Sequence, residues 1–517
     1  MNRNSLLALG ILITVYVSFF TLLSFRRHDG LKSYMNDLGN VDQSIYNTIK
    51  GRFMVMTNCY SCNSDQINRL GGHANFILLL FVPFYFVLPD PKILLFTQTL
   101  LISLGALPLY LLGKRLFKKS TWLPLVGPFI YLINPMVHDV NLYDFHTIAV
   151  AMPLIIFAFY FMYVKRYRLF SLFAILVALT NEDMSLIVFM FGLYMVFKQK
   201  EWKRGFIVSA LSLSYFFLLI QIIMPFFAKG IVINPVAYRY TYLGESVLEI
   251  MQTLITKPWI VGTSLLSMDR VVYVIWLFGS AFFLPVLSLE VFFLSLPSLF
   301  INLLSENSAM HYPFFFYYSA PILPFLFLAT IFSLLKIKKL IPNSLSFVCL
   351  GLLLILTLMS IKISPAPYSS RTSIADYSVS EHSRKIFKIK NIIPSDASLS
   401  VQNNLGAHLS QREKVYTFPY KARESDYVLV DVNDPYDGFS NIGPDFIFLT
   451  QLEFENYYEQ ILSLFENPDY GVIYFTEDGF LLFKKGYNKD QNESAEQTFF
   501  NNFEAIKRRY KKVQIYQ

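Results

Sequence analysis

Long apolar segments separated by short polar loops follow one another through residue 361. The first covers residues 5–24, and later ones include 93–113, 147–164, 206–227 and 344–361. Runs of about 18 or more apolar residues are long enough to cross a bilayer as a helix. The sequence therefore predicts a polytopic α-helical membrane protein with about eleven transmembrane helices.

The pattern of hydrophobic positions changes after residue 362. Short segments there alternate or are rich in β-branched and aromatic residues, which is typical of strands, and Asp478-Gly479 favours a hairpin turn. The expected elements are strands at 397–402, 427–432 and 472–485 and helices at 457–465 and 498–511. We therefore predict two domains: a transmembrane domain over 1–362, with a long first outer loop at 25–91, and a soluble extracytoplasmic α/β domain over 363–517.

Composition supports the membrane assignment. Hydrophobic residues make up 54% of the chain and charged residues only 15%. Soluble proteins carry about 25% charged residues, so this chain has too little polar surface for a soluble fold of its length. The net charge of +8 does not indicate nucleic-acid binding, because the basic residues gather in short loops between apolar segments.

The distribution of charge predicts the orientation. Loops at 114–119, 165–168, 198–204 and 336–339 contain fourteen Lys or Arg and one acid, whereas those at 137–147, 181–183 and 305–318 contain no Lys or Arg. The positive-inside rule places the first set in the cytoplasm and the second outside. We expect the protein to lie in the cytoplasmic membrane with its N-terminus in the cytoplasm. The alternation of loops then requires that residues 75–88 do not cross the membrane, and it places the C-terminal domain outside.

Titratable side chains collect at the predicted outer face. They are Asp37, Asp42, His73, Asp144, His146, Glu182, Asp183, Glu306 and His311. A charge near a bilayer is costly unless it has water, a partner or a function. The sequence therefore predicts a site at this face, with Arg239 as a candidate phosphate contact.

Several short motifs occur in order along the chain. They are Asp37-Leu38-Gly39 with Gln43, Gly72-His73, Gln98, Asp144-Phe145-His146, Asn181-Glu182-Asp183 and Leu296-Pro297-Ser298. Together they resemble an uncharacterised prokaryotic multi-pass membrane family, catalogued as a domain of unknown function, over residues 35–340. That family is similar in layout to the GT-C glycosyltransferases, which take a sugar from a polyprenyl-phosphate carrier.

The resemblance implies a GT-C-like fold and transfer of a sugar from a polyprenyl-phosphate donor to an extracytoplasmic glycan, lipid or protein. It implies that Asp37 is the counterpart of the catalytic acid in the first outer loop, with Asp42 as a second carboxylate. Many GT-C enzymes use a divalent cation, so both are also candidate ligands for Mg²⁺ or Mn²⁺. The candidate contacts to substrate and phosphate are His73, Asp144, His146, Glu182, Asp183, His311 and Arg239.

These candidates also have structural explanations. An Asp before Leu-Gly can cap a turn, an Asp–His pair can order a short loop, and Glu182-Asp183 can pair with Arg or Tyr. Cys59 and Cys62 form a single C-x-x-C, which a local disulfide or two free thiols would explain better than zinc. Two other functions stay open: a transporter or lipid flippase, and a non-catalytic scaffold that acts through its C-terminal domain.

Overall fold

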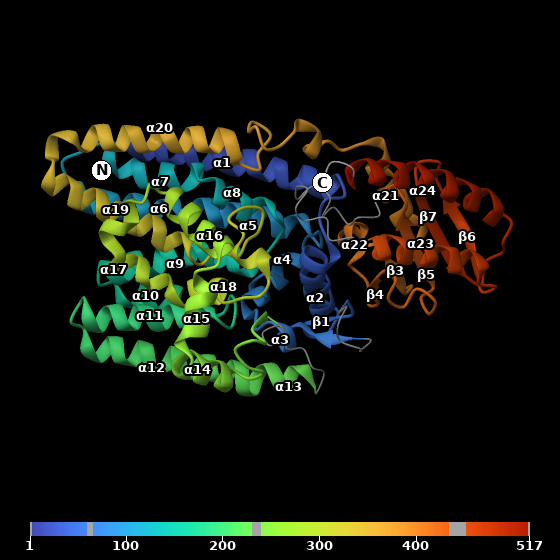
Figure 1. Ribbon diagram of the computed structural model, residues 1–517, viewed down its shortest axis with the longest axis horizontal. Helices are drawn as coiled ribbons and strands as arrows, with labels where there is room; N and C mark the ends of the chain where they lie inside the picture. The colour runs from blue at the N-terminus through green and yellow to red at the C-terminus, as the bar shows by residue number, and fades with distance from the viewer. Residues whose placement is uncertain (1–2, 59–65, 230–238, 434–450, 515–517) are drawn as a thin grey trace. The chain divides into compact units, whose positions relative to one another are not determined.

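The computed structural model describes residues 3–58, 66–229, 239–433 and 451–514. The chain forms two compact units, each assembled from separate stretches of sequence, and Figure 1 traces their elements. The membrane unit comprises residues 1–25, 69–81 and 93–377, and the α/β unit comprises 26–68, 82–92 and 378–517. The C-terminal stretch of the α/β unit thus begins at residue 378 and not at 363, and the unit also includes most of the long first loop.

The regular elements in the described part of the membrane unit are all helices, because a helix satisfies its backbone polar groups within one apolar segment. Its longer helices are α1 (Arg3–Asp29), α5 (Lys92–Leu104), α6 (Ala106–Leu116), α7 (Leu123–Ile133), α8 (Pro135–Leu142), α9 (Thr147–Tyr163), α10 (Tyr167–Ala178), α11 (Met184–Phe197), α12 (Trp202–Leu218), α14 (Val247–Thr256), α15 (Pro258–Leu265), α16 (Met268–Gly279), α18 (Leu296–Leu303), α19 (Leu323–Leu340) and α20 (Leu345–Ile363). Short helices join them: α3 (Arg69–Gly72), η2 (Phe76–Leu80), η3 (Leu219–Ile223), α13 (Met224–Ala228), η5 (Leu284–Ser288), α17 (Leu289–Phe292), η6 (Phe293–Ser295), η7 (Ser308–His311), η8 (Pro342–Ser344) and η9 (Ile374–Tyr377).

Several of these helices are long and apolar enough to cross a membrane. Among the described residues there are five such segments, or six if the bent pair α15 and α16 forms one span. They are Arg3–Asp29, Lys92–Leu116, Trp202–Ala228, Leu284–Leu303 and Pro342–Ile363, while α7, α9, α10 and α11 are apolar but shorter. The count of about eleven spans stays a prediction. Residues 75–88, expected not to cross, contain two short helices, η2 and α4 (Val82–Tyr85).

The α/β unit is built on a five-stranded sheet with strand order β4-β3-β5-β7-β6. The strands are β3 (Leu399–Val401), β4 (Val415–Thr417), β5 (Tyr427–Asp431), β6 (Tyr470–Phe475) and β7 (Phe480–Lys485). β3 runs parallel to β4 and β5, whereas β7 is antiparallel to β5 and β6. The other elements are η1 (Met35–Gly39), α2 (Asn40–Ile49), β1 (Val55–Met56), β2 (Ile67–Asn68), α21 (Glu381–Ile392), α22 (Asn403–Leu409), α23 (Gln451–Glu466) and α24 (Asn492–Gln514). The predicted strands, both helices and the hairpin turn are therefore present.

Alternate side chains of β5 enter two different hydrophobic clusters, as the two-residue period of a strand requires. Val428 and Val430 pack with residues of α23 and α24. Tyr427 and Leu429 pack on the other face, with α21 and α22. Met35 of η1 is fully buried in this second cluster, which explains why part of the first loop folds with the C-terminal strands.

The contact between η1 and α22 is close. A Cβ atom at Gly39 would lie 2.6 Å from Met35 Sδ and 3.4 Å from Ala407 Cα. A Cβ at Gly406 would lie 2.5 Å from Met35 Cβ. A side chain at Gly39 would therefore displace the end of the Met35 side chain, and one at Gly406 would meet Met35 Cβ, so Gly406 is the glycine that lets Met35 of η1 pack against α22.

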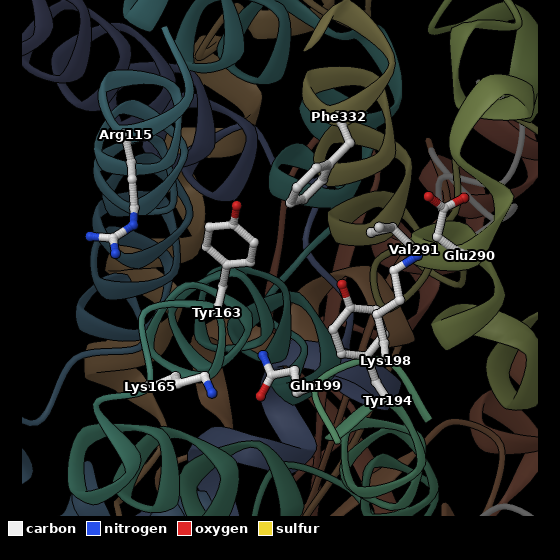
Figure 2. A pocket seen from close by; sticks show the side chains of 9 residues that line it. All are labelled: Arg115, Tyr163, Lys165, Tyr194, Lys198, Gln199, Glu290, Val291 and Phe332. Atoms are coloured by element: carbon white, nitrogen blue, oxygen red, sulfur yellow. The ribbon is translucent and has the colours of Figure 1, made fainter. Parts of the chain in front are cut away.

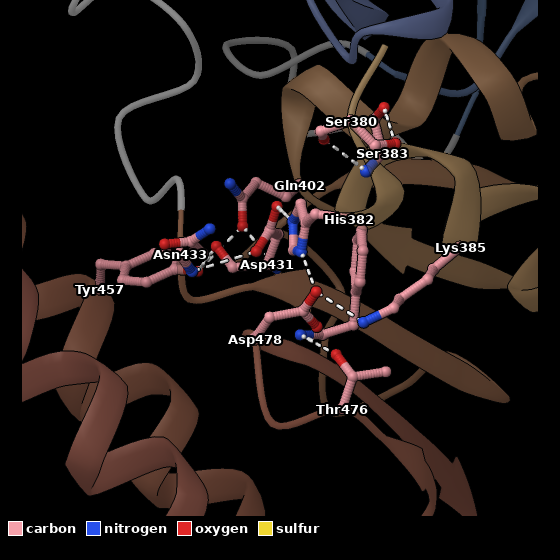
Figure 3. Close-up of polar contacts among 11 residues, drawn as sticks. Ser380, His382, Ser383, Lys385, Gln402, Asp431, Asn433, Tyr457, Thr476 and Asp478 are labelled. Atoms are coloured by element: carbon pink, nitrogen blue, oxygen red, sulfur yellow. Dashed lines mark hydrogen bonds and ion pairs between the residues drawn. The ribbon is translucent and has the colours of Figure 1, made fainter.

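A histidine ties α21 to the sheet near the carboxyl end of β5 (Figure 3). His382 Nε2 lies 2.7 Å from Asp431 Oδ2, and His382 Nδ1 lies 3.0 Å from Asp478 Oδ2 in the β6–β7 turn. Lys385 Nζ also lies 2.6 Å from Asp478 Oδ2. Burial alone would lower the pKa of His382, but the two carboxylates raise it above its ordinary value.

Candidate functional site

Three loops of the membrane unit meet: the segment after α3, the loop before α9 and the loop before α11. Asn75, in the segment after α3, joins them. Its Nδ2 lies 2.9 Å from Thr147 Oγ1 and 2.6 Å from Asn181 Oδ1. The same atom lies 2.8 Å from the carbonyl oxygen of Thr180. The loops that carry His73, Asp144–His146 and Glu182–Asp183 are therefore fixed against one another.

Glu182 and His73 form an acid–imidazole pair in this region. Glu182 Oε1 lies 3.0 Å from His73 Nδ1, and Oε2 accepts a hydrogen bond from the N–H of Ala74 at 3.1 Å. The side chain of Glu182 is 9% exposed and that of His73 is 41% exposed. Burial alone would raise the pKa of Glu182, but the charge and hydrogen bond of His73 lower it below its ordinary value. Glu182 is therefore ionised at neutral pH, and His73 is the more exposed member of the pair.

The pKa of Asp183 is shifted in the opposite direction to that of Glu182. Asn181 Nδ2 donates to Asp183 Oδ1 at 2.9 Å. Burial and the charge of Glu182 raise the pKa of Asp183 to about 6. Two adjacent carboxyl groups thus titrate in different pH ranges, the arrangement that separates acid and base roles in many active sites.

Arg239 brings positive charge to the same region. Burial raises the pKa of the neighbouring Tyr240 hydroxyl; Arg239 opposes this rise and Asp183 adds to it. The charges of Arg239 and Asp183 therefore both affect the pKa of the Tyr240 hydroxyl. The Arg239 guanidinium also lies 5.9 Å from the ring centroid of Tyr318 and 3.5 Å from Met310 Sδ.

Asp144 and His146 lie in the extended segment between α8 and α9, and Gln98 of α5 fixes that segment. Gln98 Nε2 donates to the carbonyl oxygen of Asp144 at 2.8 Å, and its Oε1 accepts from the N–H of His146 at 2.8 Å. The His146 ring stacks on Tyr317 with 3.4 Å between centroids, and Tyr317 lies 4.4 Å from Tyr318. Aromatic contacts thus run from this imidazole to the ring beside the arginine.

We call the connected residues the loop cluster: His73, Asp144, His146, Glu182, Asp183, Arg239 and Tyr240. Among the described residues, His311 makes its polar contacts with residues outside the loop cluster. Its Nε2 lies 2.6 Å from Asp269 Oδ2 and its Nδ1 lies 3.3 Å from the carbonyl oxygen of Asn302. These contacts join η7 to α16 and α18, which is a structural arrangement.

The two acids of the first loop lie in the α/β unit, and Asp42 is completely buried there. Its Oδ1 accepts hydrogen bonds from Tyr85 Oη at 2.8 Å and Gln411 Nε2 at 3.0 Å. Its Oδ2 accepts from Ser410 Oγ at 2.6 Å. Burial raises the pKa of Asp42 to about 6, although the three hydrogen bonds oppose the rise.

This environment does not fit a metal ligand. Both carboxylate oxygens of Asp42 are engaged by protein donors, and a hard cation would need those lone pairs. Among the described residues, no group of three or more His, Cys, Asp or Glu side chains is placed to hold a metal ion.

Asp37 is the more exposed of the two acids. It lies in the π-helix η1 with a half-buried side chain. The backbone N–H of Asn36 donates to Asn403 Oδ1 at 3.0 Å, so η1 is anchored to α22 directly before Asp37. The loop therefore has a fixed backbone.

A family model described as "Predicted membrane protein (DUF2079)" matches residues 27–458. The chain belongs to this family. The membership confirms the family expected from the ordered motifs, and the matched range covers parts of both units.

Among solved structures, the chain is similar to ArnT from Cupriavidus metallidurans bound to undecaprenyl phosphate. The sequence identity is 10% and the TM-score is 0.47, over 93% of this chain and 98% of ArnT. No curated protein matches the chain.

The family motifs fall into two groups by their contacts. Gln98 and Asn181 support the loop cluster directly, whereas Gly39 and Gln43 belong to the packing of the α/β unit. Sequence analysis did not assign a role to Asn75, because a lone asparagine in an apolar segment carries no spacing signal. Cys59 and Cys62 lie outside the described residues.

Proposed function

We propose that this chain is a membrane glycosyltransferase that moves a sugar from a polyprenyl-phosphate carrier to an extracytoplasmic glycan, lipid or protein. The loop cluster carries the proposal. It combines two acids with different pKa values, an imidazole and an arginine at the ends of apolar helices. Sugar transfer to a hydroxyl needs a base for the acceptor and positive donors for the departing phosphate.

In the proposed reaction, Asp183 accepts the proton of the acceptor hydroxyl. The hydroxyl oxygen forms a bond to the anomeric carbon while the bond from that carbon to the phosphate oxygen breaks, and the polyprenyl phosphate leaves. His73, held in place by Glu182, and Arg239 offer N–H donors to the departing phosphate. A base with a pKa near 6 suits this role, because it is ionised at neutral pH and close to the operating range.

Asp37 and Asp42 enter the proposal differently. Asp37 is the alternative base, since its carboxylate is half-buried and the family resemblance implies a catalytic acid in this loop. Asp42 is proposed to position the loop, because protein donors engage both of its oxygens.

Genetic complementation tests the proposal. A strain that lacks the protein would receive the wild-type chain, Asp183→Asn, Asp37→Asn or the control Asp396→Asn, an exposed acid of the α/β unit. Extracytoplasmic glycans and glycolipids would then be compared at equal protein levels. We expect deletion to remove one sugar, which Asp396→Asn restores and Asp183→Asn does not.

The other results are equally informative. If Asp37→Asn fails and Asp183→Asn restores the sugar, the transferase stands and Asp37 is its base. If deletion changes no glycan but alters movement of a solute or lipid across the membrane, the chain is a transporter and the proposal is wrong.

A further inference from the structure

Arg371, in the segment that follows α20, makes a bidentate ion pair with Asp139 of α8. Its Nη1 lies 3.0 Å from Asp139 Oδ2 and its Nη2 lies 2.9 Å from Asp139 Oδ1. The side chain of Asp139 is 2% exposed and that of Arg371 is 16% exposed. A bidentate pair sets the orientation of the guanidinium plane as well as its position. Arg371 is therefore fixed against α8.

The same guanidinium lies on an aromatic ring of a second segment. Arg371 Cζ is 3.8 Å from the ring centroid of Phe315, in the stretch between η7 and α19. The φ angle of Phe315 is +74°, in the left-handed region that a bulky side chain rarely adopts. Such a conformation persists only where the surroundings favour it, and the cation–π contact with Arg371 does so. One arginine thus holds α8 and the segment of Phe315.

These two segments are the ones that bring His146 and Tyr317 together. α8 leads directly into residues 143–146, and Tyr317 follows Phe315 by two positions. The rings of His146 and Tyr317 stack with 3.4 Å between their centroids. Movement of either segment would separate the two rings, so the contacts of Arg371 bear directly on the loop cluster.

The ion pair has a simpler explanation, because Arg371 Nη1 also donates to the carbonyl oxygen of Ile363 at 2.9 Å. The contacts with Asp139 and Ile363 alone would fasten the chain that leaves α20 to α8. They require neither a ring on the face of the guanidinium nor a left-handed backbone at Phe315. Fastening of this chain therefore accounts for only part of what Arg371 contacts.

We propose that Arg371 is a positioning residue of the loop cluster, which sets the His146 ring against Tyr317 by holding both segments that carry these rings. The next ring, Tyr318, lies 4.4 Å from Tyr317 and 5.9 Å from the Arg239 guanidinium. The same arginine thus also sets the surroundings of a proposed phosphate donor. The role in sugar transfer rests on the proposed function, whereas the effect on His146 does not.

The position of the His146 ring can be tested without a sugar substrate. The full-length chain, purified in detergent, would be treated with diethyl pyrocarbonate, which modifies imidazole nitrogens, and mass spectrometry would give the rate at each histidine. Arg371→Gln should raise the rate at His146 about fivefold or more, because the loss of the bidentate pair favours local opening of the two segments. The rate at His73, which Glu182 holds, should not change. Equal increases at both histidines would indicate general loosening and overturn the proposal.

Two further variants separate the contacts of the guanidinium. Arg371→Lys keeps the charge, but an ammonium group cannot pair in a bidentate manner and lie flat on Phe315, so this variant should resemble Arg371→Gln. Phe315→Gly keeps the ion pair, removes the ring and suits the positive φ, so it should also accelerate the reaction of His146. It serves if the Arg371 variants do not fold. A wild-type rate at His146 in Arg371→Lys or in Phe315→Gly would overturn the proposal.

Arg115→Gln is the matched control, because it removes an arginine of the same unit at a distance from His146. Figure 2 shows Arg115 and Tyr163, the last residue of α9, in the wall of one pocket. His146 directly precedes this 17-residue helix, so about 25 Å separate the two regions along its axis. We expect a wild-type rate at His146 in Arg115→Gln. An increase as large as that in Arg371→Gln would contradict the assignment.

Complementation separates this proposal from the proposed function. If deletion of the protein removes a sugar, Arg371→Gln should restore less of it than Arg115→Gln does at equal protein levels. Full restoration by Arg371→Gln, despite a faster reaction of His146, would overturn the role in transfer. If deletion changes no glycan, the proposed function fails, and the rate at His146 still decides whether Arg371 positions this ring.

Discussion

Replacing Asp42 by Asn should stabilise the protein at neutral pH. The folded pKa of Asp42 is about 6 and the ordinary value is 3.8, so the folded state binds this proton more tightly than the unfolded chain does. The protonated form contributes stability that is complete below the ordinary pKa and is lost as the pH rises through the folded pKa. The difference between the two pKa values corresponds to about 3 kcal/mol.

Asparagine imitates the protonated carboxyl group in shape and charge. Its Oδ1 can accept from Tyr85 and Gln411, and its Nδ2 can donate to Ser410 Oγ. Asp42→Asn should therefore match the wild type near pH 4 and exceed it by up to about 3 kcal/mol above pH 6. Asp42→Ala should be less stable than the wild type near pH 4, because three donors, among them the buried Tyr85 and Ser410, lose their acceptor.

The assay is thermal unfolding of the purified chain in detergent as a function of pH. The Tm difference between Asp42→Asn and the wild type should grow from near zero in acid to a plateau at neutral pH, while other titrating groups cancel in the comparison. A Tm difference that does not change with pH would refute the reasoning. It would mean that Asp42 keeps an ordinary pKa and is better solvated than its contacts indicate.

Two further substitutions test the packing of the α/β unit. Gly39→Ala should lower its stability by about 1–3 kcal/mol, measured by denaturant unfolding, because the new Cβ would lie 2.6 Å from Met35 Sδ; unchanged stability would show that the Met35 side chain can move aside. His382→Gln should be destabilising below the ordinary histidine pKa and have less effect once the pH passes the raised folded pKa, since the protonated imidazole bridges Asp431 and Asp478; a loss of Tm that is equal in acid and base would argue against the ionic bridge.

The helical and strand elements could be predicted because their signals are local. An apolar run or an Asp-Gly turn is visible within about 20 residues, and the hairpin turn at 476–479 joins β6 and β7 as expected. The family was also predictable, because its motifs occur in order along the chain.

The composition of the two units could not be predicted, because it depends on contacts between distant residues. Asp42 meets Ser410 across 368 residues of sequence, and no periodic pattern connects them. The same holds for the pair of His73 and Glu182, which are 109 residues apart. The sequence placed both at one face, but it could not indicate that they touch.

The packing role of Gly39 was not visible in the sequence of the first loop. The Asp-Leu-Gly motif predicts an active-site loop, which stays a prediction, and the structure adds that Gly39 lies against the Met35 side chain. Asp42 is likewise buried and engaged by three donors, and it was indistinguishable by sequence from the half-exposed Asp37. Residue type and spacing alone do not report burial.

The most direct test of the proposed sugar transfer at the loop cluster is a cryo-EM map of the protein with an added polyprenyl phosphate. We predict a phosphate density within hydrogen-bond distance of His73 or Arg239, which Arg239→Gln with His73→Gln should abolish. A well-defined lipid phosphate that contacts no residue of the loop cluster would contradict the account.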